Sequence, residues 1–105
     1  MEIRFDKEYL RELYVFGKTS EKKHRFQPDI IKRYQLRIQT LEKSRRAEDL
    51  YAIRSLRYEK LKGDKNGLES IRVNDQYRIE FKTEQIASET IMTICNILDL
   101  SNHYK

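Results

Sequence analysis

The chain has 105 residues, a length that suits one compact domain over residues 1–105 and leaves no room for a second. Hydrophobic residues make up 38% and charged residues 37%, so we expect a small core and a densely charged surface. The 22 basic and 17 acidic residues give a net charge of +5, which favours a polyanionic partner such as nucleic acid; a soluble surface with spare lysines is the alternative.

The cysteine content and the apolar patterning exclude several classes of protein. Cys95 is the single cysteine, so neither an intramolecular disulfide nor a cysteine-based zinc site can form. It lies in the apolar run 91–98 and is expected to be buried. The charged N-terminus does not resemble a signal peptide, and no apolar stretch reaches the roughly 20 residues that span a bilayer. We therefore expect a cytoplasmic protein without a membrane partner.

The first half of the chain predicts one short strand followed by two helices. Residues 2–5 alternate, and Asp6 suits the N-cap of a helix that ends at Gly17. After the polar, basic connection 18–25, Pro28 suits the first turn of a second helix. Its expected apolar stripe is formed by Ile30, Ile31, Tyr34, Ile38 and Leu41.

From residue 48 onwards the pattern changes toward strands. A further helical turn is expected over 48–53, with Leu50 and Ile53 pointing inward. The predicted strands are 56–61, 68–73, 77–82 and 90–98, with a loop at 63–67. Two helices followed by an antiparallel meander of three to four strands indicate an α+β architecture.

The length of the connection at residues 74–76 decides the register in which the predicted strands 68–73 and 77–82 pair. A two-residue turn would place Ile71 opposite Arg78 and mix core and charged side chains on one face. A three-residue connection instead pairs Ile71 with Ile79 and Arg72 with Arg78, which keeps one face apolar. Like charges on opposite strands are destabilising, so this register predicts an anion between the two arginines. Neutralisation by Glu80 or another carboxylate is the alternative.

The titratable residues do not suggest a metal or nucleotide-phosphate site. His24 and His103 are far apart in sequence, and neither belongs to a metal-binding pattern. Lys62-Gly63 lacks the remaining residues of a P-loop. We expect neither a metal nor a cofactor.

Cleavage of RNA without a metal remains consistent with this sequence, because RNA supplies its own nucleophile, the 2′-hydroxyl. Such a reaction needs a base, an acid and fixed positive charge at the phosphate. Arg72 and Arg78 suit the last role, and Lys60 and Lys62 add charge or a proton acceptor. His103 suits proton transfer near neutral pH.

A motif in the second half of the chain resembles the HigB toxins of the RelE/ParE superfamily. Residues 61–73 read L-K-G-D-K-N-G-L-E-S-I-R-V, and residues 77–81 read Y-R-I-E-F. The family pattern is close to L-K-G-x-x-x-G-x-x-S-I-x-V, followed by an aromatic residue, Arg and Ile. The tail 98–104 is similar to the family's last strand and its histidine-bearing end.

The resemblance implies a RelE-like fold, with N-terminal helices packed on a small curved antiparallel sheet. It implies a toxin of a type II toxin-antitoxin system, a metal-independent and ribosome-dependent mRNA endoribonuclease that inhibits translation. The implied partners are a HigA-like helix-turn-helix antitoxin, mRNA, and the 30S ribosome with its ribosomal RNA. The basic side chains of the second helix, Lys32, Arg33 and Arg37, are expected to contact the antitoxin or ribosomal RNA.

The same resemblance assigns roles to particular residues. Arg78 matches the family arginine at the scissile phosphate, and Lys62 matches the lysine of L-K-G. His103 matches the terminal catalytic histidine, with Tyr104 after it where many members have a tyrosine before it. Glu59 stands where some members carry a histidine, and a glutamate is the weaker base at neutral pH. Further RNA contacts are expected from Lys60, Lys65 and Arg72.

Two other functions fit the same fold class. A ParE-like relative would inhibit DNA gyrase and cut no RNA, although it would not need Lys62, Arg78 and His103 together. A non-catalytic module that binds RNA or the ribosome would lose affinity in step with the charge removed. A nuclease would instead lose rate sharply when His103 or Arg78 is replaced.

Overall fold

The computed structural model describes residues 1–87 and 91–102. The helices are α1 (Glu8–Phe16) and α2 (Pro28–Lys43), and the strands are β1 (Glu2–Phe5), β2 (Glu59–Lys60), β3 (Glu69–Arg72), β4 (Arg78–Ala87) and β5 (Ile91–Ser101). Short 3-10 helices are η1 (Lys22–His24), η2 (Ala47–Ala52), η3 (Arg54–Leu56) and η4 (Gly63–Lys65). No helix in the described ranges is both long and apolar enough to cross a membrane.

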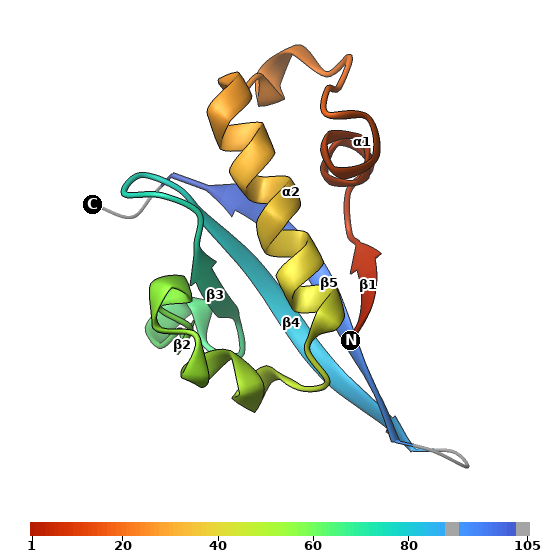
Figure 1. Cartoon of the computed structure of the whole chain (residues 1–105), viewed down its shortest axis with the longest axis vertical. Coiled ribbons are helices and arrows are strands. Elements are labelled where there is room, and N and C mark those ends of the chain that lie inside the picture. Colours follow the sequence, from red (N-terminus) through yellow and green to blue (C-terminus); the bar gives the residue numbers. More distant parts are fainter. Residues whose placement is uncertain (88–90, 103–105) are drawn as a thin grey trace.

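The strands of the described residues form one five-stranded sheet in the order β1-β5-β4-β3-β2. Neighbouring strands from β2 to β5 are antiparallel, as predicted, but β1 runs parallel to β5 and makes the sheet mixed. Figure 1 shows α2 lying across the long strands β4 and β5, with α1 beside β1. The expected α+β architecture is confirmed, with a parallel strand added at one edge.

Both predicted helices form, and their ends follow the expected signals. Gly17 adopts a left-handed φ of 72° and ends α1, because its backbone N–H bonds to the carbonyl of Leu13. Pro28 begins α2. The predicted N-cap at Asp6 is wrong by one residue, because the cap position of α1 is Lys7 and carries no side-chain bond.

The core lies between the helices and one face of the sheet. The stripe of α2 is confirmed for Ile30, Tyr34, Ile38 and Leu41, which are all buried, while Ile31 is half-buried. Each fully buried side chain of this size contributes on the order of 1.5–3 kcal/mol. The hydroxyl of Tyr34 donates to the carbonyl of Leu10 at 2.7 Å, so this phenol is buried without an unsatisfied donor.

Several element predictions for the second half need correction. The strand expected over 56–61 shrinks to β2, because Leu56 is buried in η3 and Arg57 turns the chain with a left-handed φ of 46°. Ile53, expected to point inward, is 40% exposed. Both long strands extend further than predicted, and β4 and β5 pair as far as Ala87 with Ile91.

The predicted register of β3 and β4 is confirmed. Ile71 pairs with Ile79 and Arg72 pairs with Arg78. The apolar face does contain one carboxylate, that of Glu69, which is buried. This carboxylate accepts hydrogen bonds from the hydroxyl of Tyr58 at 2.5 Å and from the backbone N–H and hydroxyl of Thr83 at 2.9 and 2.7 Å. Burying it is therefore compensated by fixed donors.

Candidate functional site

The polar face of the sheet gathers charged side chains from three adjacent strands. Cross-strand partners share a face, and so do residues two apart along a strand. Glu59 of β2 pairs with Ser70 of β3, which pairs with Glu80 of β4. Arg72 and Arg78 pair next to them. The helices α1 and α2 cover the other face, and a ligand from solvent can reach this cluster at the half-exposed side chain of Glu59 and the partly exposed side chain of Arg72.

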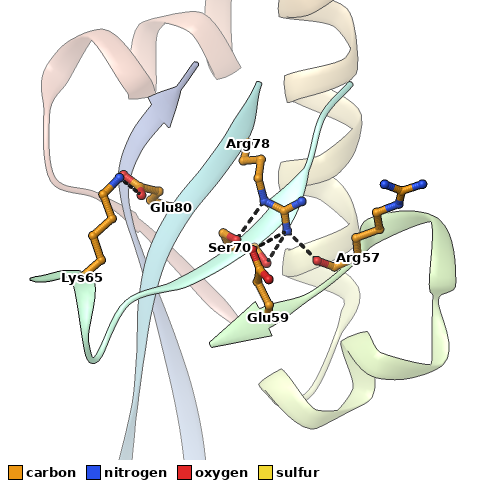
Figure 2. Close-up of polar contacts among 6 residues, drawn as sticks. All are labelled: Arg57, Glu59, Lys65, Ser70, Arg78 and Glu80. Atoms are coloured by element: carbon orange, nitrogen blue, oxygen red, sulfur yellow. Dashed lines mark hydrogen bonds and ion pairs between the residues drawn. The ribbon is translucent and has the colours of Figure 1, made fainter. Parts of the chain in front are cut away.

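Arg78 is the most firmly held member of the cluster. Its side chain is 11% exposed, although it carries a full charge. The Nε atom donates to the Ser70 hydroxyl at 3.0 Å, and Nη2 donates to the carbonyls of Arg57 at 2.5 Å and Ser70 at 3.4 Å. Figure 2 shows the guanidinium lying over Ser70 between Glu59 and Arg57. These neutral acceptors fix the orientation of the cation while leaving its charge in place.

Local sequence explains how this arrangement forms. Ser70 is fully buried, and its small side chain leaves room for the guanidinium to lie across β3. Arg57 has a positive φ, which is uncommon for a residue other than glycine, and its carbonyl meets Arg78. A hydroxyl and a carbonyl therefore hold the arginine at the start of β4.

Glu59 forms an ion pair with this arginine. Its Oε1 atom lies 3.8 Å from Nη2 of Arg78, and its side chain is 53% exposed. A half-exposed carboxylate beside a buried, fixed cation can accept a proton from a ligand that contacts the same guanidinium. The two groups thus form an acid–base and electrostatic pair on one surface.

Arg72 has a carboxylate partner of its own. Its Nη2 atom donates to Asp75 in the turn before β4, and this hydrogen bond, with the charge of Arg72, lowers the pKa of the Asp75 carboxyl. The backbone carbonyl of Arg72 accepts from Nε of Arg37 at 3.0 Å. Arg37 is therefore half-buried against the sheet, and its contact with the antitoxin or ribosomal RNA stays a prediction. An anion between Arg72 and Arg78 stays a prediction.

The lysines predicted from sequence do not gather at one point. Lys65 forms an ion pair with the buried carboxylate of Glu80 at 2.6 Å. Lys62 is exposed and precedes η4. Lys60 pairs with Glu69 across β2 and β3, which places it on the face opposite Glu59. There it lines a cavity of about 310 Å³ and is separated from the Arg78 cluster by the sheet.

The two proposed C-terminal residues, His103 and Tyr104, lie outside the described residues. The last residue of β5, Ser101, is the cross-strand partner of Arg78. In the part of the chain that the structure describes, no group of three or more histidine, cysteine, aspartate or glutamate side chains is placed to hold a metal ion.

Sequence reasoning missed two supports of the site. The carbonyl of Arg57 carries no signal in the sequence, since every residue has one. Ser70 received no role from the sequence motif in which it stands, although its hydroxyl orients Arg78. A small polar residue opposite an arginine on a sheet face is the signal that could have found it.

Comparisons with known proteins place this chain in a family. The model of the RelE-like toxin of type II toxin-antitoxin system HigB matches residues 3–95. Among solved structures, a YoeB/ParE toxin from Agrobacterium tumefaciens is similar with a TM-score of 0.57 and 15% identity, over 99% of this chain and 100% of that one. At this identity the likeness shows the fold alone. No curated protein sequence matches the chain.

Proposed function

Because the chain belongs to the HigB family of RelE-like toxins from type II toxin-antitoxin systems, we propose that it is an endoribonuclease that cleaves mRNA on the ribosome and stops translation. The observation that carries this proposal is the fixed guanidinium of Arg78 beside the half-exposed carboxylate of Glu59. The protein would act in the cytoplasm, where translating ribosomes are found.

The proposed reaction needs no nucleophile from the protein. Glu59 accepts the proton of the 2′-hydroxyl, whose oxygen attacks the adjacent phosphorus. Arg78 stabilises the additional negative charge that develops on the phosphate oxygens. The bond from phosphorus to the 5′ oxygen breaks, and His103 donates a proton to that oxygen. The products are a 2′,3′-cyclic phosphate and a 5′-hydroxyl, so protons and charge balance without a metal ion.

The remaining candidates are assigned supporting roles in this proposal. Lys62 is exposed on the loop after β2 and would contact the RNA backbone. Arg72 lies beside Arg78 on the polar face and would add positive charge near the same phosphates. Tyr104 would stack on a base next to the cut. Lys65 would serve RNA indirectly, by neutralising Glu80.

Membership of this family implies an antitoxin partner. We propose a HigA-like helix-turn-helix protein in that role, and ribosomal RNA as the surface that presents the mRNA. The exposed cations Lys32 and Arg33 of α2 are available for either contact, whereas Arg37 is held against Arg72. Charge reversal at Lys32 and Arg33 that changed neither interaction would remove this part of the proposal.

Primer extension on a reporter mRNA in a translating extract tests the proposed activity. Wild-type protein is expected to produce discrete cuts within the reading frame, only when ribosomes are present. Arg78→Ala and His103→Ala should remove those cuts, while an exposed control such as Lys43→Ala should keep them. An intact message with wild-type protein would end the nuclease proposal and make inhibition of DNA gyrase the next activity to assay.

A further inference from the structure

A second polar cavity, of about 270 Å³, lies where the end of β5 meets the connection between α1 and α2. Strand β1 pairs with β5 only as far as Ile97, where the N–H of Asp6 bonds to the Ile97 carbonyl. Beyond that point the edge of β5 faces residues 23–26 instead of a strand. The cavity is lined by Lys23, His24, Arg25, Phe26, Tyr77 and the segment 99–102.

The lining combines cations with aromatic rings. Lys23 and Arg25 are exposed, and the rings of Phe26 and Tyr77 meet edge to face with centroids 5.5 Å apart. The imidazole of His24 stacks on Tyr9 with centroids 3.6 Å apart. The acidic residue of the lining, Asp99, already accepts a hydrogen bond from the Tyr9 hydroxyl at 2.9 Å. Positive charge beside aromatic rings is the chemistry that binds single-stranded nucleic acid.

The position of the cavity connects it to the Arg78 cluster. Ser101, a lining residue, is the cross-strand partner of Arg78 and shares its face of the sheet, whereas the ring of Tyr77, the residue before Arg78, packs against the core on the opposite face. Cross-strand partners have Cβ atoms about 4.5–5.5 Å apart. The guanidinium of Arg78 leans over β3 towards Ser70, so an RNA strand that contacts it crosses about two strand spacings of roughly 4.8 Å each before it reaches this cavity beside β5.

We propose that this cavity is a subsite for a nucleotide of the RNA that flanks the phosphate at Arg78. Lys23 and Arg25 would contact the flanking phosphate, and the rings of Phe26 and Tyr77 would receive the base. This inference rests on the proposed nuclease function and adds the residues that hold the substrate beside the cut. An acidic segment of the antitoxin is the competing occupant; the aromatic lining and the closeness to Arg78 favour RNA.

The test compares two double variants that remove the same charge. Lys23→Ala/Arg25→Ala removes the cations of the cavity, and Lys43→Ala/Arg45→Ala removes two exposed cations at the other end of α2. Both pairs are exposed, so thermal melting should be unchanged in each. The readouts are the toxin concentration that gives half-maximal cleavage in the translating extract, and the salt dependence of that concentration.

The cavity variant is expected to need at least about tenfold more toxin, with a weaker salt dependence, because phosphate contacts release counterions. Phe26→Leu, which keeps the site apolar but removes the ring, should raise the same concentration about fivefold or more. The control variant should stay within about twofold of wild type.

The possible failures are distinguishable. If wild-type protein cuts and both double variants cut equally well, the subsite is wrong while the nuclease stands. If cutting is unchanged but the antitoxin no longer neutralises the cavity variant, the cavity serves the antitoxin and the subsite is again wrong. If wild-type protein does not cut, the proposed function and this inference both fail.

Discussion

The carboxylate of Glu59 lies 3.8 Å from the guanidinium of Arg78, measured from Oε1 to Nη2, on the face of the sheet that the helices leave open. The carboxylate is half-exposed, whereas the guanidinium is buried and oriented by Ser70 and the Arg57 carbonyl. The cation is therefore positioned before any substrate arrives. Such preorganisation is what stabilises charge that develops in a transition state.

Arg78→Lys separates the charge of this residue from its geometry. A lysine keeps the positive charge but lacks the planar set of donors that reaches both Ser70 and Arg57. We expect the cleavage rate to fall by about 100-fold or more in Arg78→Lys, in line with the loss of one preorganised donor group. Single-turnover cleavage on ribosome-bound mRNA measures this rate, and circular dichroism checks the fold. A lysine variant with the wild-type rate would show that geometry at this position does not matter.

Ser70→Ala tests the hydrogen bond that orients the Arg78 guanidinium. The substitution removes the hydroxyl that accepts a hydrogen bond from Nε of the buried guanidinium. Losing this acceptor should lower the free energy of unfolding by about 1–3 kcal/mol. The midpoint of urea unfolding should fall accordingly, and cleavage should weaken with it. Ser55→Ala, at an exposed serine, is the matched control and should leave both unchanged. Equal stability of the two variants would contradict the proposed role of Ser70.

Glu59→Gln removes the proposed base while keeping nearly the same shape. Loss of a positioned general base typically lowers the rate by 10²–10⁴-fold, so kcat should fall within that approximate range while KM changes little. Because Glu59 is half-exposed, the melting temperature should stay close to that of wild type. A variant with unchanged kcat would move the role of base to another residue.

The buried thiol of Cys95 predicts that the folded protein loses stability at alkaline pH. Burial raises the pKa of this thiol to about 12, so the folded protein keeps the proton at a pH where the unfolded chain loses it. The stability from this group is complete below about pH 9, the ordinary value for the thiol, and is lost progressively as the pH rises toward 12. The buried phenol of Tyr34, whose pKa burial also raises, acts in the same direction.

Alkylation of the thiol at pH 8 provides the direct readout. Native protein should react far more slowly than protein in denaturing urea, since the buried thiol is both protonated and inaccessible. Urea midpoints should fall between pH 9 and pH 11, and less steeply in Cys95→Ala. Rapid alkylation of native protein would contradict the burial of Cys95.

Local sequence patterns predicted the helices, from their spacing of apolar residues and their terminal Gly17 and Pro28, and the register of β3 and β4. The pairing of Arg72 with Arg78 followed from keeping Ile71 and Ile79 on one apolar face. The parallel pairing of β1 with β5 was not predictable in the same way, because it joins residues about 90 positions apart and leaves no local signal. The outer half of β4 was missed because Glu84 and Gln85 lie in an exposed part of the hairpin. Neither face of the hairpin is buried there, so the sequence shows no alternation of apolar and polar residues.

The candidate site was predicted in its residue types and only in part in its geometry. Glu59 and Arg78 were both named from the motif, and their side chains do meet. Lys60 falls on the opposite face because consecutive residues of a strand point to opposite faces, and Glu59 is the one that pairs with Ser70. The hydrogen bond of Arg37 to the sheet was not predictable, because its acceptor is a backbone carbonyl 35 residues away.

The most direct test of the central claim uses mRNA bound to purified ribosomes, with a single 2′-deoxy nucleotide at the position that wild-type protein cuts. The proposed chemistry predicts that the all-ribose message is cleaved to a 2′,3′-cyclic phosphate and a 5′-hydroxyl, and that the 2′-deoxy message stays intact at that position. Cleavage of both messages at the same rate, or of neither, would contradict the account.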